Sequence, residues 1–112
     1  KLSKEQIINQ AFKYHSKGNI SEAAKYYRYF INRRFIDHRV FSNYGVILRG
    51  LGKSQEAELS YRKALEINPN FTEVHFNLGA ILSDLGKLEE LILLSKSTLV
   101  LRSIKNVPHF SI

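Results

Sequence analysis

The sequence repeats itself every 34 residues, and this period limits the fold more than any other feature. Residues 42–45 (SNYG) align with residues 76–79 (FNLG), and residues 51–53 align with residues 85–87 at the same offset. A glycine recurs at one phase of the period, as Gly18, Gly52 and Gly86. Units of this size cannot bury an apolar face alone, so they stack on their neighbours. The chain is therefore predicted to be a linear array of similar units.

Each unit has the pattern of two helices joined by a turn. Apolar residues recur at helical spacing, at Tyr44, Ile47, Leu48 and Leu51 and again at Leu78, Ile81, Leu82 and Leu85. The recurring glycine ends the first helix, and Ser21 and Ser54 are candidate caps for the second. Small residues, such as Gly45 opposite Ala57, let the paired helices cross closely. The predicted helices cover residues 4–17, 20–34, 38–51, 54–67, 72–85 and 88–102.

This pattern resembles the tetratricopeptide repeat (TPR) family over nearly the whole chain. The second repeat fits the family best, with typical residues at Gly45, Leu48, Ala57, Tyr61, Ala64 and Pro69. The resemblance implies an all-α, right-handed α-solenoid of three helix-turn-helix repeats, with six helices and a short C-terminal tail. On this basis the chain is a single domain over residues 1–112, with repeats at 4–37, 38–71 and 72–103 and a tail at 104–112.

The same resemblance implies a concave groove, lined by the first helix of each repeat, that binds a peptide or protein segment. The residues it places there as candidates are Asn9, Phe12, Arg39, Asn43, Val46, Arg49, Phe76 and Asn77. It also places Ile8 and Ser42 in this groove. A recurring asparagine offers both a donor and an acceptor to a peptide backbone, and groove aromatics suit an apolar anchor. The alternatives are that the asparagines bond within the scaffold and that Phe12 or Phe76 packs on its own repeat.

One particular TPR ligand is excluded by the residues at these positions. Some TPR domains hold the C-terminal carboxylate of a chaperone in a clamp of lysine, asparagine and arginine. The corresponding positions here are Ile8, Phe12, Asn43, Glu73 and Asn77. Only Asn43 matches clearly, and Glu73 has the wrong charge, so we reject a chaperone-tail clamp.

The net charge of +7 favours either a well-solvated surface or an acidic partner. Lysine and arginine are spread along most of the chain, which favours the first interpretation. A nucleic-acid-binding helical repeat is the alternative, because residues 25–34 interleave basic and aromatic side chains. Tyr27 and Phe30 fall at core positions of that helix, so few aromatics remain for base stacking. We therefore do not expect nucleic acid as a partner.

The sequence predicts a non-catalytic protein. It contains no cysteine, and His15, His38, His75 and His109 show no metal-ligand spacing. We expect no metal, no cofactor and no membrane span, because the apolar stretch from 88 to 101 is short and interrupted by polar residues. A cytoplasmic location is expected, although a chain without cysteine suits reducing and oxidising compartments alike. The alternative is that this is the TPR segment of a larger enzyme.

The third repeat departs from the pattern after Glu90. Its second helix is apolar around most of its circumference, whereas a terminal repeat needs a polar outer face. We predict that this helix mediates a homodimer through Leu91, Leu94, Leu99 and Leu101. Two alternatives remain open: the tail folds back over the helix, or a following repeat covers it.

Overall fold

The computed structural model describes residues 1–87, 90 and 92–96. All the regular secondary structure among these residues is α-helix. The helices are α1 (Lys4–Ser16), α2 (Ile20–Asn32), α3 (His38–Gly50), α4 (Ser54–Ile67) and α5 (Thr72–Asp84). Residues 90 and 92–96 are also helical, within the sixth predicted helix. Each of the five complete helices ends within two residues of its predicted bounds, which confirms the helical assignment.

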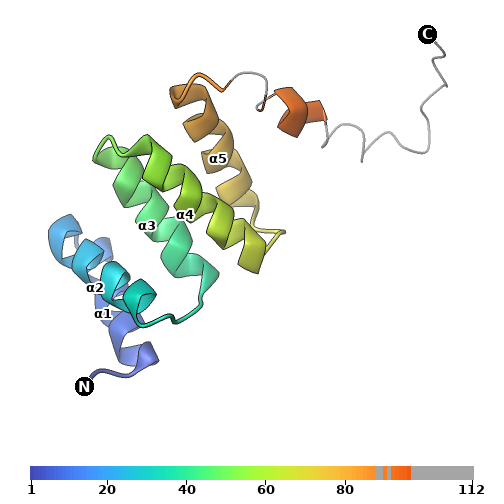
Figure 1. The fold of residues 1–112 in the computed structure, drawn as a ribbon. Helices are drawn as coiled ribbons and strands as arrows, with labels where there is room; N and C mark the ends of the chain where they lie inside the picture. Colours follow the sequence, from blue (N-terminus) through green and yellow to red (C-terminus); the bar gives the residue numbers. More distant parts are fainter. Residues whose placement is uncertain (88–89, 91, 97–112) are drawn as a thin grey trace, which may run out of the picture.

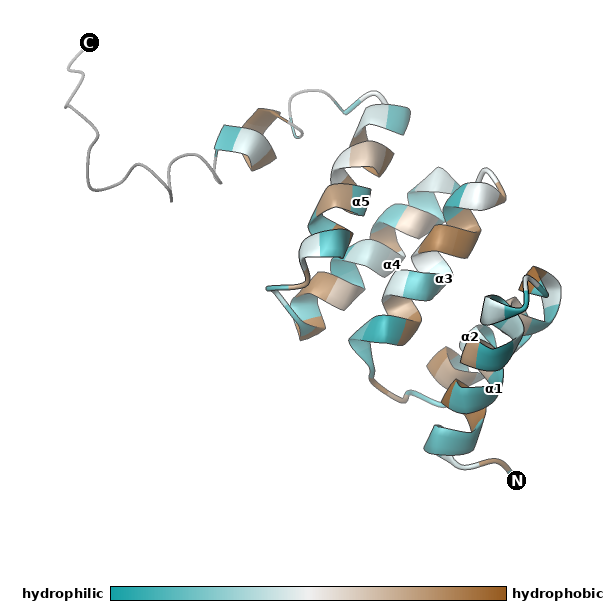
Figure 2. Ribbon diagram, turned by 180° about the vertical axis from the view of Figure 1, so that it is seen from behind, coloured by the Kyte–Doolittle hydropathy of each residue, from teal (hydrophilic) through white to brown (hydrophobic). Residues whose placement is uncertain are grey.

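The helices form two layers along a row of pairs (Figures 1 and 2). The first helix of each repeat, α1, α3 or α5, faces the viewer in Figure 2, whereas α2 and α4 are nearer in Figure 1. The closest packing is within the pairs, α1 on α2 and α3 on α4, and α5 then packs on α4. This order is the one expected for stacked helix-turn-helix units.

Polar side chains start three of the five helices. Ser3 and Gln6 form a capping box at α1, Asn19 accepts a hydrogen bond from the backbone of Glu22 at α2, and Asp37 accepts from Arg39 at α3. The predicted caps were wrong. Ser21 lies inside α2, and Ser54 is the first helical residue of α4, whose N-cap Lys53 makes no side-chain cap bond.

The recurring glycines perform the role predicted for them. Gly18, Gly52 and Gly86 have φ of 76°, 78° and 70°, a conformation that ends a helix and that residues with a Cβ rarely adopt. Arg34 has φ of 62° at the end of α2, so the link between the first two repeats contains a left-handed residue that is not glycine. The link between α4 and α5 instead contains Pro69, directly after the C-cap Asn68.

The core consists of two apolar clusters, one in each of the first two pairs. Tyr27 and Phe30, both fully buried, are the largest side chains of the first cluster. Tyr61 is the largest of the second, which extends to Val74 and Leu78 of α5. Ile31 and Tyr44 pack against both clusters, so the apolar core continues from repeat to repeat.

The closest approach between paired helices is at Gly45. A Cβ added there would lie 2.6 Å from Cε1 of Tyr61, inside the closest distance at which two carbon atoms can pack. Tyr61 is 1% exposed, so its ring has no free space into which it could move. Small residues at this crossing were predicted, and the structure shows that the group which requires Gly45 is the Tyr61 ring.

We therefore expect Gly45→Ala to lower the free energy of unfolding by about 1–3 kcal/mol, because the added methyl overpacks a closed site. The matched control is Gly50→Ala, at the end of the same helix, where an added Cβ meets nothing within 4 Å. That control should be neutral or stabilising by up to about 1 kcal/mol. Urea unfolding followed by far-ultraviolet circular dichroism measures both. Equal stability of the two variants would contradict the packing argument.

Candidate binding groove

The candidate residues lie on α1, α3 and α5, which line one face of the array (Figure 2). Asn9, Val46 and Phe76 are exposed, and Phe12, Asn43 and Asn77 are half-buried. Two positions expected in the groove are not there. Ile8 and Ser42 are both 2% exposed and belong to the interior, since their side chains point between helices and not out of the face.

The part of the groove between α1 and α3 is closed by a hydrogen-bonded cluster. The Asn43 side-chain amide donates to the Tyr27 hydroxyl at 3.2 Å, and that hydroxyl lies 2.8 Å from Nδ1 of His15. The Tyr27 hydroxyl thus accepts one hydrogen bond, from Asn43, and shares a second with Nδ1 of His15. Asn43 therefore bonds within the scaffold, the alternative left open for the asparagines.

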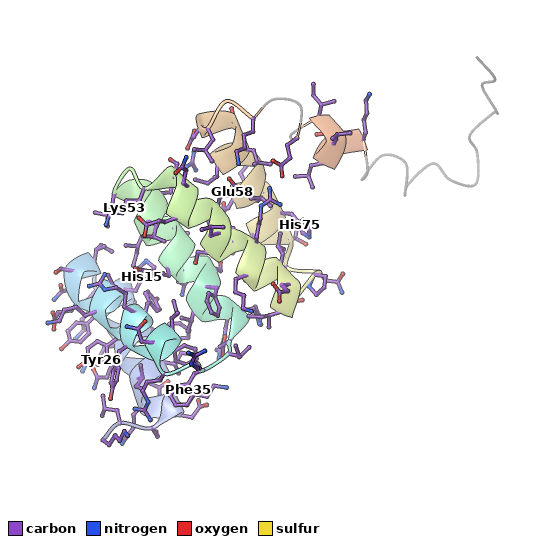
Figure 3. All side chains as sticks on the ribbon, in the orientation of Figure 1. His15, Tyr26, Phe35, Lys53, Glu58 and His75 are labelled. Atoms are coloured by element: carbon purple, nitrogen blue, oxygen red, sulfur yellow. The ribbon has the colours of Figure 1, made fainter. Side chains whose placement is uncertain are left out.

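Burial shifts the ionisation of this cluster. Desolvation raises the pKa of Tyr27 to about 12, opposed by the hydrogen bond from Asn43. Desolvation also lowers the pKa of His15 below its ordinary 6.5, which favours the neutral ring. His15 is labelled in Figure 3, on α1. The cluster is uncharged at neutral pH and offers hydrogen bonds only.

Phe12 and Arg39 cover each other at the same end of the groove. The Arg39 guanidinium carbon lies 5.2 Å from the centre of the Phe12 ring, and Phe12 also packs on the first core cluster. Arg39 makes two further side-chain hydrogen bonds to Asp37, at 3.0 and 2.7 Å. A cavity of about 250 Å³ remains, lined by Phe12, His15, Ser16 and Asn43.

The part of the groove between α3 and α5 is more open. Phe76 is 79% exposed and Val46 is 41% exposed, so two apolar side chains on neighbouring helices face outward. Arg49 of α3 donates to Asp84 of α5 at 2.9 Å, which ties the two helices together. The structure records no hydrogen bond between the Asn77 side chain and any described residue.

The two groove arginines are both paired within the chain, a feature that sequence reasoning missed. The hydrogen bond to Asp37 raises the pKa of Arg39, and the hydrogen bond to Asp84 raises the pKa of Arg49. Burial opposes ionisation of Asp37, but the hydrogen bonds and charge of Arg39 outweigh it and lower the pKa of that carboxyl. Both guanidinium groups therefore already have a carboxylate, so they are poorly suited to hold one from a ligand.

The basic and aromatic residues of α2 do not form a stacking surface. Tyr27 is buried in the core, and Tyr26 stacks on Tyr14 with ring centres 5.7 Å apart. Arg33 donates to the hydroxyl of Tyr29 and lies over its ring. The rings of Tyr26, Tyr27 and Tyr29 thus each contact another side chain of the chain.

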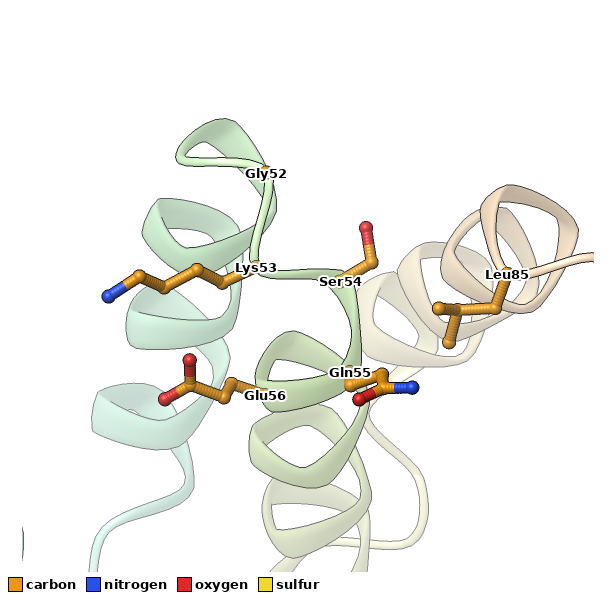
Figure 4. A pocket seen from close by; sticks show the side chains of 6 residues that line it. All are labelled: Gly52, Lys53, Ser54, Gln55, Glu56 and Leu85. Carbon is orange, nitrogen blue, oxygen red and sulfur yellow. The ribbon is translucent and has the colours of Figure 1, made fainter.

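Further cavities among the described residues lie away from the groove. One of about 420 Å³ lies at the turn before α4, lined by Gly52, Lys53, Ser54, Gln55, Glu56 and Leu85 (Figure 4). The described residues contain no group of three or more histidine, aspartate, glutamate or cysteine side chains that could hold a metal ion. No helix among them has the length and apolar character needed to cross a membrane.

Beyond α5, the chain is attached to α4 by charged side chains. Glu58, labelled in Figure 3, accepts from Arg62 and from Lys87 at 2.9 Å each, and Arg62 also pairs with Glu90. The hydrogen bond from Lys87 is the main cause of the lowered pKa of Glu58, although burial opposes it. Glu58 is only 8% exposed, so it is a buried carboxylate held between two cations.

The apolar residues of the last helix divide between two faces. Leu94 packs on the second core cluster, whereas Ile92 and Leu93 are 43% and 65% exposed. Leu91, Leu99 and Leu101, which the sequence assigns to a dimer contact, lie outside the described residues. The exposed pair was not among the residues predicted for that contact.

The lowered pKa of His15 gives a pH-dependent stability with a defined sign. As the pH falls, His15 is protonated in the unfolded chain before it is protonated in the folded chain. The contribution of neutral His15 to the free energy of unfolding is therefore complete above pH 6.5 and is lost as the pH falls. We expect His15→Gln to reduce the loss of urea resistance between about pH 7.5 and pH 5.5. Asp37 and Glu58 act at lower pH, because their pKa values are shifted downward. An unchanged pH dependence in the variant would contradict this assignment.

Comparison with known proteins agrees with this geometry. Residues 45–89 match the sequence profile of the family described as TPR repeat, and no curated protein sequence matches the chain. A mutant of MamA has a similar structure, with a TM-score of 0.73 and 24% identity, covering 83% of this chain and 68% of that one. The TPR2B domain of yeast Sti1, in complex with pHsp70, gives a TM-score of 0.72 at 22% identity, covering 92% and 82%. Together, the 34-residue period, the paired helices and the profile match over residues 45–89 show that this chain has the tetratricopeptide repeat fold.

Proposed function

We propose that this chain is a non-catalytic protein-interaction module that binds a peptide or protein segment in the groove lined by α1, α3 and α5. The proposal treats residues 1–112 as one domain of three repeats, the third of them atypical. Its function is that of a scaffold or adaptor, in which the helices supply a rigid surface and the groove side chains supply recognition.

The observation that carries this proposal is the exposure of Phe76. An aromatic ring that is 79% exposed on a rigid helix is suited to serve as an anchor for a partner side chain. Val46, on the neighbouring α3, extends the apolar surface, and Asn77 follows Phe76 with its amide available. Rigid neighbouring helices hold these groups in place, so a ligand would meet a preformed surface.

The similar structures support a polypeptide as the ligand class. The Sti1 domain was solved in a complex with pHsp70, so this fold can hold another polypeptide. The resemblance there is in fold alone, because identity is 22%. We therefore take from this similar structure only the class of ligand, a polypeptide, and not the sequence of that ligand.

We expect Phe76→Ala to weaken binding of groove ligands by more than about tenfold, because it removes the largest exposed apolar contact. Ligands can be obtained by selecting random displayed peptides on the immobilised chain, and their affinities measured by fluorescence anisotropy. Leu59→Ala is the matched control, since Leu59 is 68% exposed but lies on α4. Selected peptides that bind both variants equally well would show that the groove is not the binding site.

We also propose that the chain self-associates through the helix that follows α5. Ile92 and Leu93 expose apolar side chains on that helix. A two-fold contact with a second copy would bury these two side chains of each chain. The proposal retains Leu91, Leu99 and Leu101 as further contact residues. Leu94 packs on the core of its own chain, so replacing it would also disturb the repeat.

We expect Leu93→Gln to shift the chain from dimer to monomer without lowering its helix content, because Leu93 is exposed within the monomer. Light scattering on a size-exclusion column measures the mass, and circular dichroism measures the helix content. Leu59→Gln, at a similarly exposed leucine on α4, should leave the dimer intact. A monomeric mass for the unmodified chain would rule out this second proposal.

A further inference from the structure

The charge of the groove is opposite in sign to that of the whole chain. Four carboxylates lie at or beside it, on Glu5, Asp37, Glu73 and Asp84, against two guanidinium groups, on Arg39 and Arg49. Both guanidinium groups are taken, by Asp37 and Asp84. The groove therefore has a surplus of negative charge on a protein whose net charge is +7.

The two surplus carboxylates, Glu5 and Glu73, are exposed, and neither forms an ion pair with any described residue. Both lie close enough to act on groove side chains. The pKa of Arg39 is raised mainly by its hydrogen bond to Asp37, and the charge of Glu5 adds to this shift. Burial raises the pKa of Tyr61, the charge of Arg49 opposes that shift, and the charge of Glu73 adds to it. A cation entering this face would meet both carboxylates without first displacing a partner.

The two halves of the groove differ in the hydrogen bonds they leave open. Tyr27 and Tyr61 are equivalent by the 34-residue period, as are Asn43 and Asn77. The Tyr27 hydroxyl is occupied by His15 and Asn43, whereas the structure records no hydrogen bond from the Tyr61 hydroxyl to a described residue.

The two halves differ at one repeat position, which is histidine at 15 and arginine at 49. Arg49 pairs with Asp84 and does not bond Tyr61. Tyr61 is only 1% exposed, so its hydroxyl is not presented to a ligand. The half of the groove between α3 and α5 thus offers the Asn77 side-chain amide, which bonds no described residue, beside Val46 and Phe76.

We infer that the groove ligand is a basic polypeptide segment, with lysine or arginine beside a large apolar residue, docked on the half between α3 and α5. Its cation pairs with Glu73, its apolar side chain packs on Phe76 and Val46, and its backbone bonds the Asn77 side-chain amide. This inference rests on the proposed function, and it reverses the preference for acidic partners that the net charge alone suggests.

The peptide selection described above tests both ideas and separates them. If no selected peptide depends on Phe76, the groove proposal fails and the ligand chemistry fails with it. If peptides depend on Phe76 and are enriched in lysine and arginine over aspartate and glutamate, the inference is supported. If they depend on Phe76 but are enriched in aspartate and glutamate, or in neither sign of charge, groove binding stands and the inference is overturned.

A charge-removal variant tests the assigned contact directly. For the selected peptides, we expect Glu73→Gln to weaken binding about three- to fivefold and to reduce its dependence on salt concentration. Glu56→Gln is the matched control, because Glu56 is an exposed carboxylate on α4 that forms no ion pair with a described residue. Equal effects of the two variants, or none from Glu73→Gln, would overturn the assignment of the ligand cation to Glu73.

Discussion

Two buried tyrosines, Tyr27 and Tyr61, connect the core of this array to its surface. Each ring is the largest apolar group of its cluster, and the ring of Tyr61 fixes the identity of the residue opposite it as glycine. The Tyr27 hydroxyl bonds His15 of α1 and Asn43 of α3, on the layer of helices that Figure 2 shows in front. The groups that hold the repeats together therefore also set the hydrogen bonds available in the groove. A change that loosens the core would alter recognition at the same time.

The fold could be predicted almost completely from the sequence, because it depends on a periodic pattern. The period, the helical spacing and the glycines at Gly18, Gly52 and Gly86 are local features that recur, and the structure agrees with each. The helix caps could not be predicted as well. Asn19, and not Ser21, caps α2, a difference of two residues that helix periodicity does not resolve.

The groove was less predictable, because repeat positions assign a side of the helix but not the neighbours of a side chain. Phe12 and Phe76 were both expected to be groove aromatics, yet Phe12 lies under Arg39 while Phe76 is exposed. Arg49 pairs with Asp84, 35 residues away, a long-range contact that no local pattern indicates. Whether a groove residue is free for a ligand therefore depends on its tertiary contacts. For this reason, two proteins with the same fold need not bind the same ligand.

The cluster of Glu58, Arg62, Lys87 and Glu90 attaches the segment after α5 to α4, beside the apolar contact of Leu94 with the second core cluster. The groove between α3 and α5 likewise combines apolar packing with an ion pair, between Arg49 and Asp84. Salt weakens exposed ion pairs, whereas apolar contacts persist in it. The attachment of the last segment and the tie across this half of the groove therefore both loosen as ionic strength rises, while the apolar core of the first repeat does not.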